Sequence, residues 1–217
     1  MEAVICTVDV VLLCLRDGAL QLLLQQRQMP PEQGRLALPG GYIRPEQDAD
    51  TRAAALRVLH EKTGVTPPYL EQLATFSGAT RDPRGWSLSV VYYALVPASS
   101  LGPDVTLCPV QALPALPFDH AQIAAAALDR LRSKGAYSSL PCFLLGERFT
   151  LPELQKTYEI ILAEPLNKSE FRRKIFSMGF LEECPGELQY EGARRPAQYY
   201  RLQAAWRGRL NVRERGL

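Results

Sequence analysis

Two neighbouring glycines and a following helix form the part of this sequence best suited to phosphate chemistry. Gly40 and Gly41 come directly after a short apolar run, and Arg57 and Glu61 lie on a helix predicted over residues 50–62. A glycine loop that leads into a helix can place backbone N–H groups and the positive helix end against a phosphate. Arg57 adds a cation, and Glu61 adds a carboxylate of the kind that binds a divalent metal ion. These residues indicate a site for a phosphorylated ligand.

Apolar strands and a second helix must position this site. Asp17-Gly18 between two apolar runs predicts a hairpin, and Gly64 ends the helix that carries Glu61. Apolar, β-branched segments predict strands at residues 3–15, 19–27, 36–38, 70–78 and 86–96. An alanine-rich helix is expected over residues 120–134, with Gly135 as its stop. This order predicts a mixed sheet between two helices, an α/β/α sandwich of the α+β class.

The stretch from residue 38 to residue 65 resembles the signature of Nudix hydrolases, which cleave nucleoside diphosphates linked to another moiety. That family binds Mg²⁺ through carboxylates that align, counting back from Gly64, with positions 58, 61 and 62. This sequence has Val58, Glu61 and Lys62 there. A methyl-bearing side chain and a cation are not ligands for Mg²⁺. We therefore expect no metal site, a vestigial Glu61 that pairs with Lys62 or Arg57, and pyrophosphatase activity that is absent or very weak.

An active Nudix hydrolase of ADP-ribose or a related dinucleotide is the alternative interpretation. It would retain Mg²⁺, with Glu61 and improvised ligands from Gln47, Asp48 or Asp50. The expected sensor requires no cofactor. Mg²⁺-dependent turnover of ADP-ribose that disappears in Glu61→Gln would favour the hydrolase.

Loss of the metal does not imply loss of the ligand. Arg81 and Arg84 lie in a loop bounded by proline and glycine, where they could grip a pyrophosphate bidentately. Aromatic residues of the next strand could stack a base, although strand packing is their more ordinary role: Trp86, Tyr92 and Tyr93. A salt bridge from Arg57 to Glu61 is at least as good a role for Arg57 as ligand contact. The predicted ligand-binding set is Gly40, Gly41, Arg57, Glu61, Arg81 and Arg84.

The second half of the chain reads as a helix-turn-helix followed by a hairpin. Thr150 and Glu153 form a capping box at the start of one helix, and Ala163-Glu164-Pro165 breaks it. A second helix is expected over residues 168–178, and two strands over residues 180–183 and 198–202. A helix-turn-helix with such a hairpin is the winged-helix architecture.

Basic residues on the second helix and at the hairpin tip indicate contact with DNA. Residues 1–135 hold 12 Lys and Arg against 13 Asp and Glu, whereas residues 136–217 hold 13 against 10. The helix would enter the major groove while the hairpin reaches phosphates or the minor groove. A winged helix can also serve as a protein-interaction module, which remains open. The predicted DNA-binding residues are Lys168, Ser169, Arg172, Arg173, Lys174, Arg194 and Arg195.

Taken in order, six motifs resemble the Nudix-related transcriptional regulators of the NrtR type: LPGGYIRP, EKTG, FDH at 118–120, RFTLPELQ, FRRKIFSMGFLEE and RRPAQYYRL. The resemblance implies a Nudix-like sensor over residues 1–135 and a winged helix over residues 136–217. It implies an ADP-ribose-like nucleotide effector and control of NAD metabolism or a related cofactor pathway. It further implies a homodimer on a near-palindromic operator.

The composition argues against a membrane or secreted protein. No run of about 18 apolar residues exists, so a membrane span is excluded. The apolar N-terminal segment contains Asp9 and lacks a basic leader, which favours a strand over a signal peptide. The five cysteines are scattered and form no C-x-x-C pair, so we expect neither a zinc cluster nor disulfides, and a reducing cytoplasm as the location.

Overall fold

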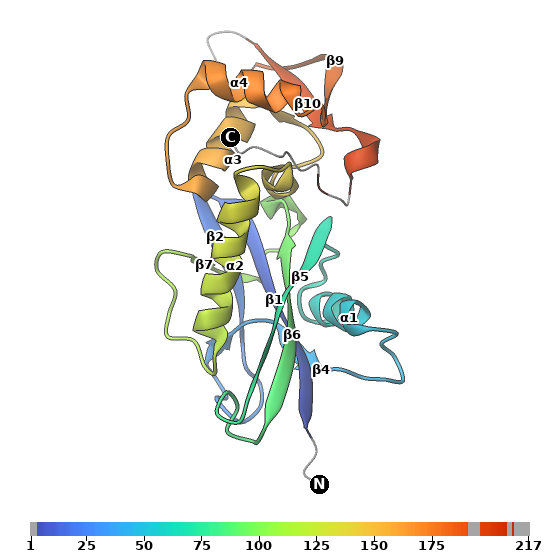
Figure 1. The fold of residues 1–217 in the computed structure, drawn as a ribbon, viewed down its shortest axis with the longest axis vertical. Helices are drawn as coiled ribbons and strands as arrows, with labels where there is room; N and C mark the ends of the chain where they lie inside the picture. The colour runs from blue at the N-terminus through green and yellow to red at the C-terminus, as the bar shows by residue number, and fades with distance from the viewer. Residues whose placement is uncertain (1–3, 191–195, 208–209, 211–217) are drawn as a thin grey trace.

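A computed structural model describes residues 4–190, 196–207 and 210 of the protein. Its first part is a sheet with one helix on each face (Figure 1). The elements of this part are β1 (Ile5–Arg16), β2 (Ala19–Gln26), β3 (Leu36–Ala37), β4 (Gly40–Tyr42), α1 (Thr51–Thr63), β5 (Tyr69–Gly78), β6 (Ser87–Leu95), the 3-10 helix η1 (Ala98–Ser100), β7 (Thr106–Pro109) and α2 (His120–Gly135).

Strand β1 is the centre of this sheet. It pairs in parallel with β6, and on its other edge it pairs antiparallel with β4 near its start and with β2 near its end. Strand β5 joins β6, while β3 and β7 join β2. The short strand β4 was not predicted. The sequence indicated a glycine loop there, but Gly40 and Gly41 lie in β4 and pair with Asp9 and Val8 of β1.

Alternation along β1 explains why a helix covers each face of the sheet. Successive side chains of a strand point to opposite faces. Val11 and Leu13 belong to the core under α2, which contributes Ile123 and Leu131. The intervening residues of β1 belong to a second core with α1: Val10, Leu12 and Cys14 pack with Ala55 and Leu59. The predicted α/β/α sandwich is confirmed.

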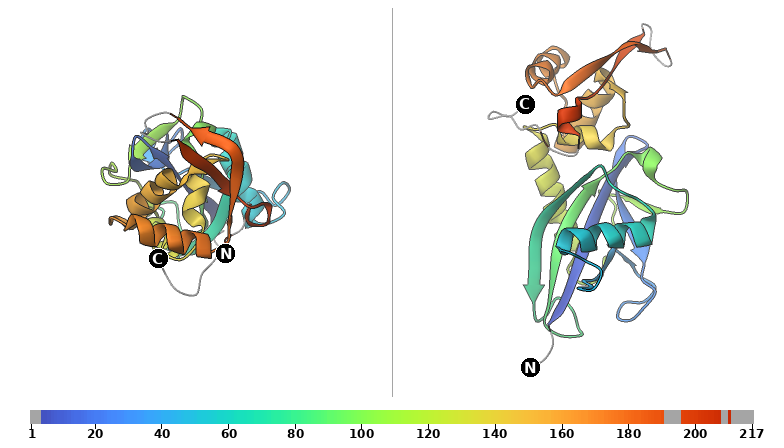
Figure 2. Two further views of the ribbon diagram at one scale, coloured as in Figure 1. Left: turned by 90° about the horizontal axis from the view of Figure 1, so that it is seen from above. Right: turned by 90° about the vertical axis from the view of Figure 1, so that its right-hand side faces the viewer.

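The second part of the chain is a winged helix at one end of the sandwich (Figure 2). Its elements are the 3-10 helix η2 (Leu140–Leu144), β8 (Phe149–Thr150), α3 (Leu151–Leu162), α4 (Lys168–Ser177), β9 (Leu181–Gln189), β10 (Ala197–Leu202) and the 3-10 helix η3 (Ala204–Trp206). The capping box of Thr150 and Glu153 is confirmed. The strands lie in the order β8-β10-β9, so β9 is an edge strand.

Strand β9 is longer than the sequence indicated. The sequence predicted a strand over residues 180–183, yet β9 continues through Pro185 and Gly186 to Gln189. A proline is tolerated there because an edge strand leaves one side of its backbone without a ladder partner. The pairing of β9 with β10 also shifts register between Gln198 and Tyr200.

The two parts of the chain share a continuous core. Leu140, Phe143 and Leu144 of η2 pack in the core beneath α2, while Cys142 between them packs in the winged-helix core. Ile161 of α3 also belongs to the core beneath α2. The boundary drawn after residue 135 remains a prediction, and the segment beyond it packs on both sides.

Helix α2 ends at Gly135 as predicted, and this glycine also lies at the contact with α3. It is the last residue of α2, and the following Ala136 is right-handed, so no left-handed stop is formed. A Cβ on Gly135 would lie 3.1 Å from Cγ2 of Ile161. A side chain at Gly135 would therefore press on Ile161 where α2 approaches α3. Nearby, the Tyr158 hydroxyl donates to the Ser138 carbonyl over 2.7 Å.

No helix in the part of the chain described above is long and apolar enough to cross a membrane.

Ile161→Ala tests the shared core. Because Ile161 is 1% exposed, its truncation should leave a cavity and lower the free energy of unfolding by about 2–5 kcal/mol. Chemical denaturation measures this change. Leu188→Ala removes a side chain that is 38% exposed, and it should change the free energy by no more than about 0.5 kcal/mol. Equal losses in the two variants would contradict the shared core.

Candidate functional site

Strand β4, with Gly40 and Gly41, lies beside a pocket of about 810 Å³, a volume suited to a small-molecule ligand. Of the predicted ligand-binding set, Gly40, Gly41, Arg81 and Arg84 line the pocket. Arg57 and Glu61 do not. The sequence reasoning missed several charged or titratable lining residues: Asp9, Arg27, Arg44, Lys62, Asp104 and His120.

Val58 fills the place of one metal-binding carboxylate with hydrocarbon. Its side chain is 1% exposed and packs with Val8 and Ala54. The Cγ2 methyl lies 3.1 Å from the position that a Cβ on Gly41 would take. A side chain at Gly41 would therefore press on Val58. Mg²⁺ needs oxygen ligands, so the position does not fit the ion.

The remaining carboxylates near α1 bind arginines. Arg57 donates from Nε and Nη2 to the two oxygens of Asp48 over 2.7 and 2.8 Å. Glu61 accepts from Arg57 over 3.3 Å and from Arg44 over 2.8 Å. The predicted pairing of Glu61 with Arg57 is confirmed. The pairing with Lys62 is wrong, because Arg44 from the loop after β4 reaches Glu61 instead.

The improvised metal ligands of the hydrolase interpretation have other roles. Asp50 caps α1 by accepting from the Ala53 N–H over 2.7 Å. Gln47 accepts from Arg44 over 3.2 Å, and Asp48 is held by Arg57. Among residues 4–190, 196–207 and 210, no group of three or more His, Cys, Asp or Glu side chains could hold a metal ion. The donor set does not fit Mg²⁺.

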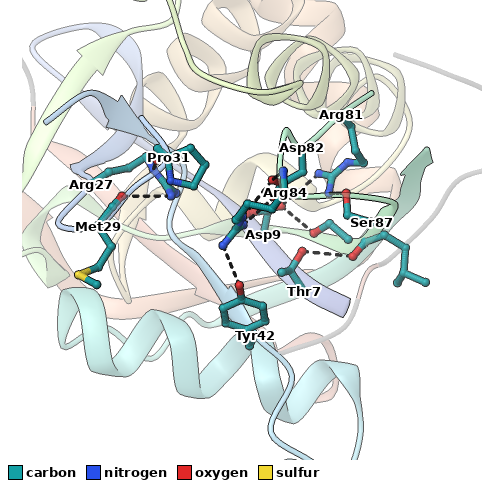
Figure 3. A network of polar contacts seen from close by, with 12 residues as sticks. Thr7, Asp9, Arg27, Met29, Pro31, Tyr42, Arg81, Asp82, Arg84 and Ser87 are labelled. Atoms are coloured by element: carbon teal, nitrogen blue, oxygen red, sulfur yellow. Dashed lines mark hydrogen bonds and ion pairs between the residues drawn. The ribbon is translucent and has the colours of Figure 1, made fainter. Parts of the chain in front are cut away.

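Arg81 and Arg84 lie at the pocket but are already paired (Figure 3). Arg81 donates from Nε and Nη2 to the two oxygens of Asp119, each over 2.9 Å. Arg84 binds both oxygens of Asp82 and donates to the Tyr42 hydroxyl over 2.7 Å. Their contact with a pyrophosphate remains a prediction. Each guanidinium is neutralised by a carboxylate, which weakens its pull on a ligand.

A buried polar cluster behind the glycines was not foreseen. Asp9 of β1 accepts from the Ser89 hydroxyl over 2.7 Å, and a Cβ on Gly40 would lie 2.0 Å from its Oδ1. Only glycine fits there. His120 Nδ1 accepts from the Leu38 N–H over 3.1 Å, so a neutral ring carries its proton on Nε2, which lies 3.8 Å from Asp9. Burial lowers the pKa of His120, which favours that neutral form.

Two of the three aromatic residues considered for base stacking are structural. Tyr93 is fully buried, and Tyr92 is 5% exposed with its hydroxyl 2.8 Å from that of Thr51. Trp86 is 47% exposed. The strand-packing interpretation is therefore confirmed for both tyrosines.

Helix α4 lies at the end of the molecule that is far from the sandwich (Figures 1 and 2). Its inner face buries Phe171 and Ile175, and Asn167 caps its first turn. Exposed on the outer face are Lys168, Ser169, Arg172 and Arg173. Lys174 is half-buried, with Nζ 3.1 Å from Glu170.

The predicted basic residues of the hairpin cannot be placed in the structure. Arg194 and Arg195 lie outside the described residues. On its described strands, Arg201 pairs with Glu182 over 2.8 Å, and Glu187 of β9 pairs with Arg148. Among the predicted DNA-binding residues that the structure describes, the exposed basic ones therefore lie on the outer face of α4.

Comparison with known proteins agrees with both parts of the chain. Residues 7–131 match the NUDIX domain and residues 141–202 match the NrtR DNA-binding winged helix domain. The chain is 43% identical to the ADPR responsive transcriptional repressor NtrR of Acinetobacter baylyi, over 90% of this chain and 81% of that protein. The chain belongs to the NrtR family.

Two crystal structures of Shewanella oneidensis NrtR are similar to this chain. NrtR complexed with a 27mer DNA has a TM-score of 0.87 and 39% identity, covering 98% of this chain and 99% of that one. The NUDIX domain of NrtR complexed with ADP ribose has a TM-score of 0.54 and 41% identity, covering 60% of this chain and 90% of that one. The sandwich followed by a winged helix is the NrtR fold.

The pairing of Arg57 with Asp48 predicts a response to acid. The hydrogen bond from Arg57, together with the Arg44 N–H, lowers the pKa of Asp48 from 3.8 to about 2. A pKa lowered by folding stabilises the protein above the unfolded pKa, and this contribution is lost as pH falls from about 4 to about 2. Arg57→Gln should therefore lose less stability than the unmodified protein over that window. Thermal midpoints measured between pH 2 and pH 5 test this.

Arg52→Gln is the matched control, because Arg52 is an exposed arginine of the same helix. It should keep the acid dependence of the unmodified protein. If Arg57→Gln kept it as well, the pair with Asp48 would not set the pKa.

Proposed function

We propose that this protein is a DNA-binding transcriptional repressor whose Nudix domain binds ADP-ribose, or a similar nucleotide, without hydrolysing it. The observation that carries the proposal is a retained pocket whose metal position is filled by Val58. A pocket without a fitting metal site suits binding better than hydrolysis. The relatives support both ligands, since one is named as an ADPR responsive repressor and NrtR structures hold DNA and ADP ribose.

The proposal includes a homodimer on a near-palindromic operator. Each chain carries one α4, and a two-fold axis would place two such helices in successive major grooves, about one helical turn apart. It further includes a cytoplasmic location and control of genes of NAD metabolism or a related cofactor pathway, as the family resemblance implies.

Helix α2 supplies a physical route from pocket to DNA. Its first residue, His120, lines the pocket, and the preceding Asp119 holds Arg81. Its last residue, Gly135, contacts Ile161 of α3. An effector that binds one placement of α2 more tightly than another would shift the winged helices with it.

A gel shift on DNA upstream of the gene and its neighbours tests the proposal. The protein should retard at least one fragment, and ADP-ribose should release it. ADP-ribose recovered afterwards in the presence of Mg²⁺ should be intact. Absence of any shift at low salt would contradict the repressor, and conversion of ADP-ribose to AMP would favour the hydrolase.

Arg172→Ala tests the DNA-binding face. Loss of one phosphate contact should weaken binding to all sequences alike and reduce the slope of log affinity against log salt by about 1. Lys156→Ala removes an exposed cation of α3 in the same domain, and it should bind as the unmodified protein does. Equal behaviour of the two variants would move the DNA contact away from α4.

A further inference from the structure

The arginines near the pocket divide into neutralised and free cations. Three that the sequence suggested as ligands each form an ion pair with a carboxylate: Arg57 with Asp48, Arg81 with Asp119 and Arg84 with Asp82. Arg44, which lines the pocket, is paired with Glu61. A phosphate would have to compete with these carboxylates for the same donors.

Two lining cations have no carboxylate partner. Arg27, from the loop after β2, donates to the carbonyls of Pro31 and Met29 over 2.9 and 3.5 Å (Figure 3). These carbonyls orient its guanidinium but leave its charge. Lys62 occupies the last turn of α1 and opens on the same pocket. Neither forms an ion pair with any residue in the described part of the chain.

The backbone around both cations is held in place. Gln25 of β2 donates to the Lys62 carbonyl over 2.5 Å, which ties the end of α1 to the strand that leads to Arg27. The Arg27 guanidinium lies over the Phe118 ring at 4.7 Å. Phe118 has a φ of 56°, a strained conformation that the surrounding structure must hold.

The two cations are close enough to influence each other. Desolvation by surrounding protein atoms, followed by the positive charge of Arg27, lowers the pKa of Lys62. Asp9 and Glu61 oppose this effect by raising the pKa of Lys62, but the net direction is downward. Each of these carboxylates already has another partner, since Asp9 binds Ser89 and Arg81 and Glu61 binds Arg44. Asp82 is paired with Arg84. Asp104 is the exposed carboxylate of the lining, set against two free cations. An anion that entered the pocket would relieve this repulsion.

We propose that Arg27 and Lys62 form a diphosphate subsite that binds the effector without a divalent metal. The inference rests on the proposed nucleotide sensor. Lys62 stands where the Nudix pattern has a metal-binding glutamate, so an ammonium replaces both the carboxylate and the positive charge that the metal would bring. The fork of Arg27 can donate to one phosphoryl group while Lys62 neutralises the other.

Calorimetric titration of the full-length protein with ADP-ribose tests the subsite, in EDTA and again in Mg²⁺. The unmodified protein should bind with the same affinity in both. Lys62→Gln and Arg27→Gln should each weaken binding about 10- to 100-fold, the loss expected for one charged hydrogen bond. Lys62→Arg, which keeps the charge, should recover most of the affinity.

Arg52→Gln is the control, because it removes an exposed cation of α1 outside the pocket lining. Its affinity should be unchanged. Thermal unfolding of each variant verifies that it is folded. Inorganic pyrophosphate should compete with ADP-ribose for the unmodified protein and should compete less well for Lys62→Gln.

The outcomes separate this inference from the function on which it rests. Binding that requires Mg²⁺, or binding unchanged in both glutamine variants, would overturn the subsite and leave the sensor in place. Failure of the unmodified protein to bind ADP-ribose in either buffer would overturn both. Metal-independent binding that falls in both variants supports the subsite.

Discussion

The contact between Val58 and Gly41 is the constraint on which the site depends. It joins α1 to strand β4, and the side chain that Val58 places there is hydrocarbon. A carboxylate placed there would be buried among Val8 and Ala54, where an isolated charge is costly. The same contact that holds the loop in the Nudix arrangement therefore removes a ligand that Nudix hydrolysis requires.

The ion pairs around that contact also maintain the fold while occupying carboxylates that a metal ion would need. Asp48 precedes α1 and Glu61 lies on it, where metal ligands would be expected, but Asp48 binds Arg57 and Glu61 binds Arg44. The pairs hold the loop before α1 to the helix itself. Fixed ion pairs keep the shape of the pocket without any ion to organise it. Within the described part of the chain, Arg27 and Lys62 line the pocket and form no ion pair with a carboxylate.

Much of the fold could be predicted because its signals are local. The hairpin at Asp17-Gly18, the helix end at Gly64 and the capping box at Thr150 each depend on residues within one turn of the chain. The length of β9 could not, because tolerance of Pro185 depends on its position at a sheet edge. The role of Gly135 depends on the approach of a different helix.

The charges of the site were the hardest part to predict, because ion pairing joins distant residues. Arg81 meets Asp119 from another element, and the need for glycine at position 40 comes from Asp9 on a neighbouring strand. The sequence correctly marked Val58 and Lys62 as departures from a metal site. It could not reveal which cations remain unpaired, since that depends on the spatial arrangement of every nearby carboxylate.

The replacement of metal ligands by Val58 and Lys62 suits a sensor better than an enzyme. If the protein cleaved its effector, its occupancy would depend on the rate of cleavage as well as on the effector concentration. If the pocket only binds the effector, its occupancy depends on the effector concentration and the affinity. The shift that a ligand can cause is limited by its difference in affinity between two states of the protein. In the proposed sensor, α2 joins the pocket to α3, and that difference would be set where His120 and Arg81 line the pocket and where Gly135 approaches Ile161. Binding energy that hydrolysis would direct to a transition state is then available to move the winged helix.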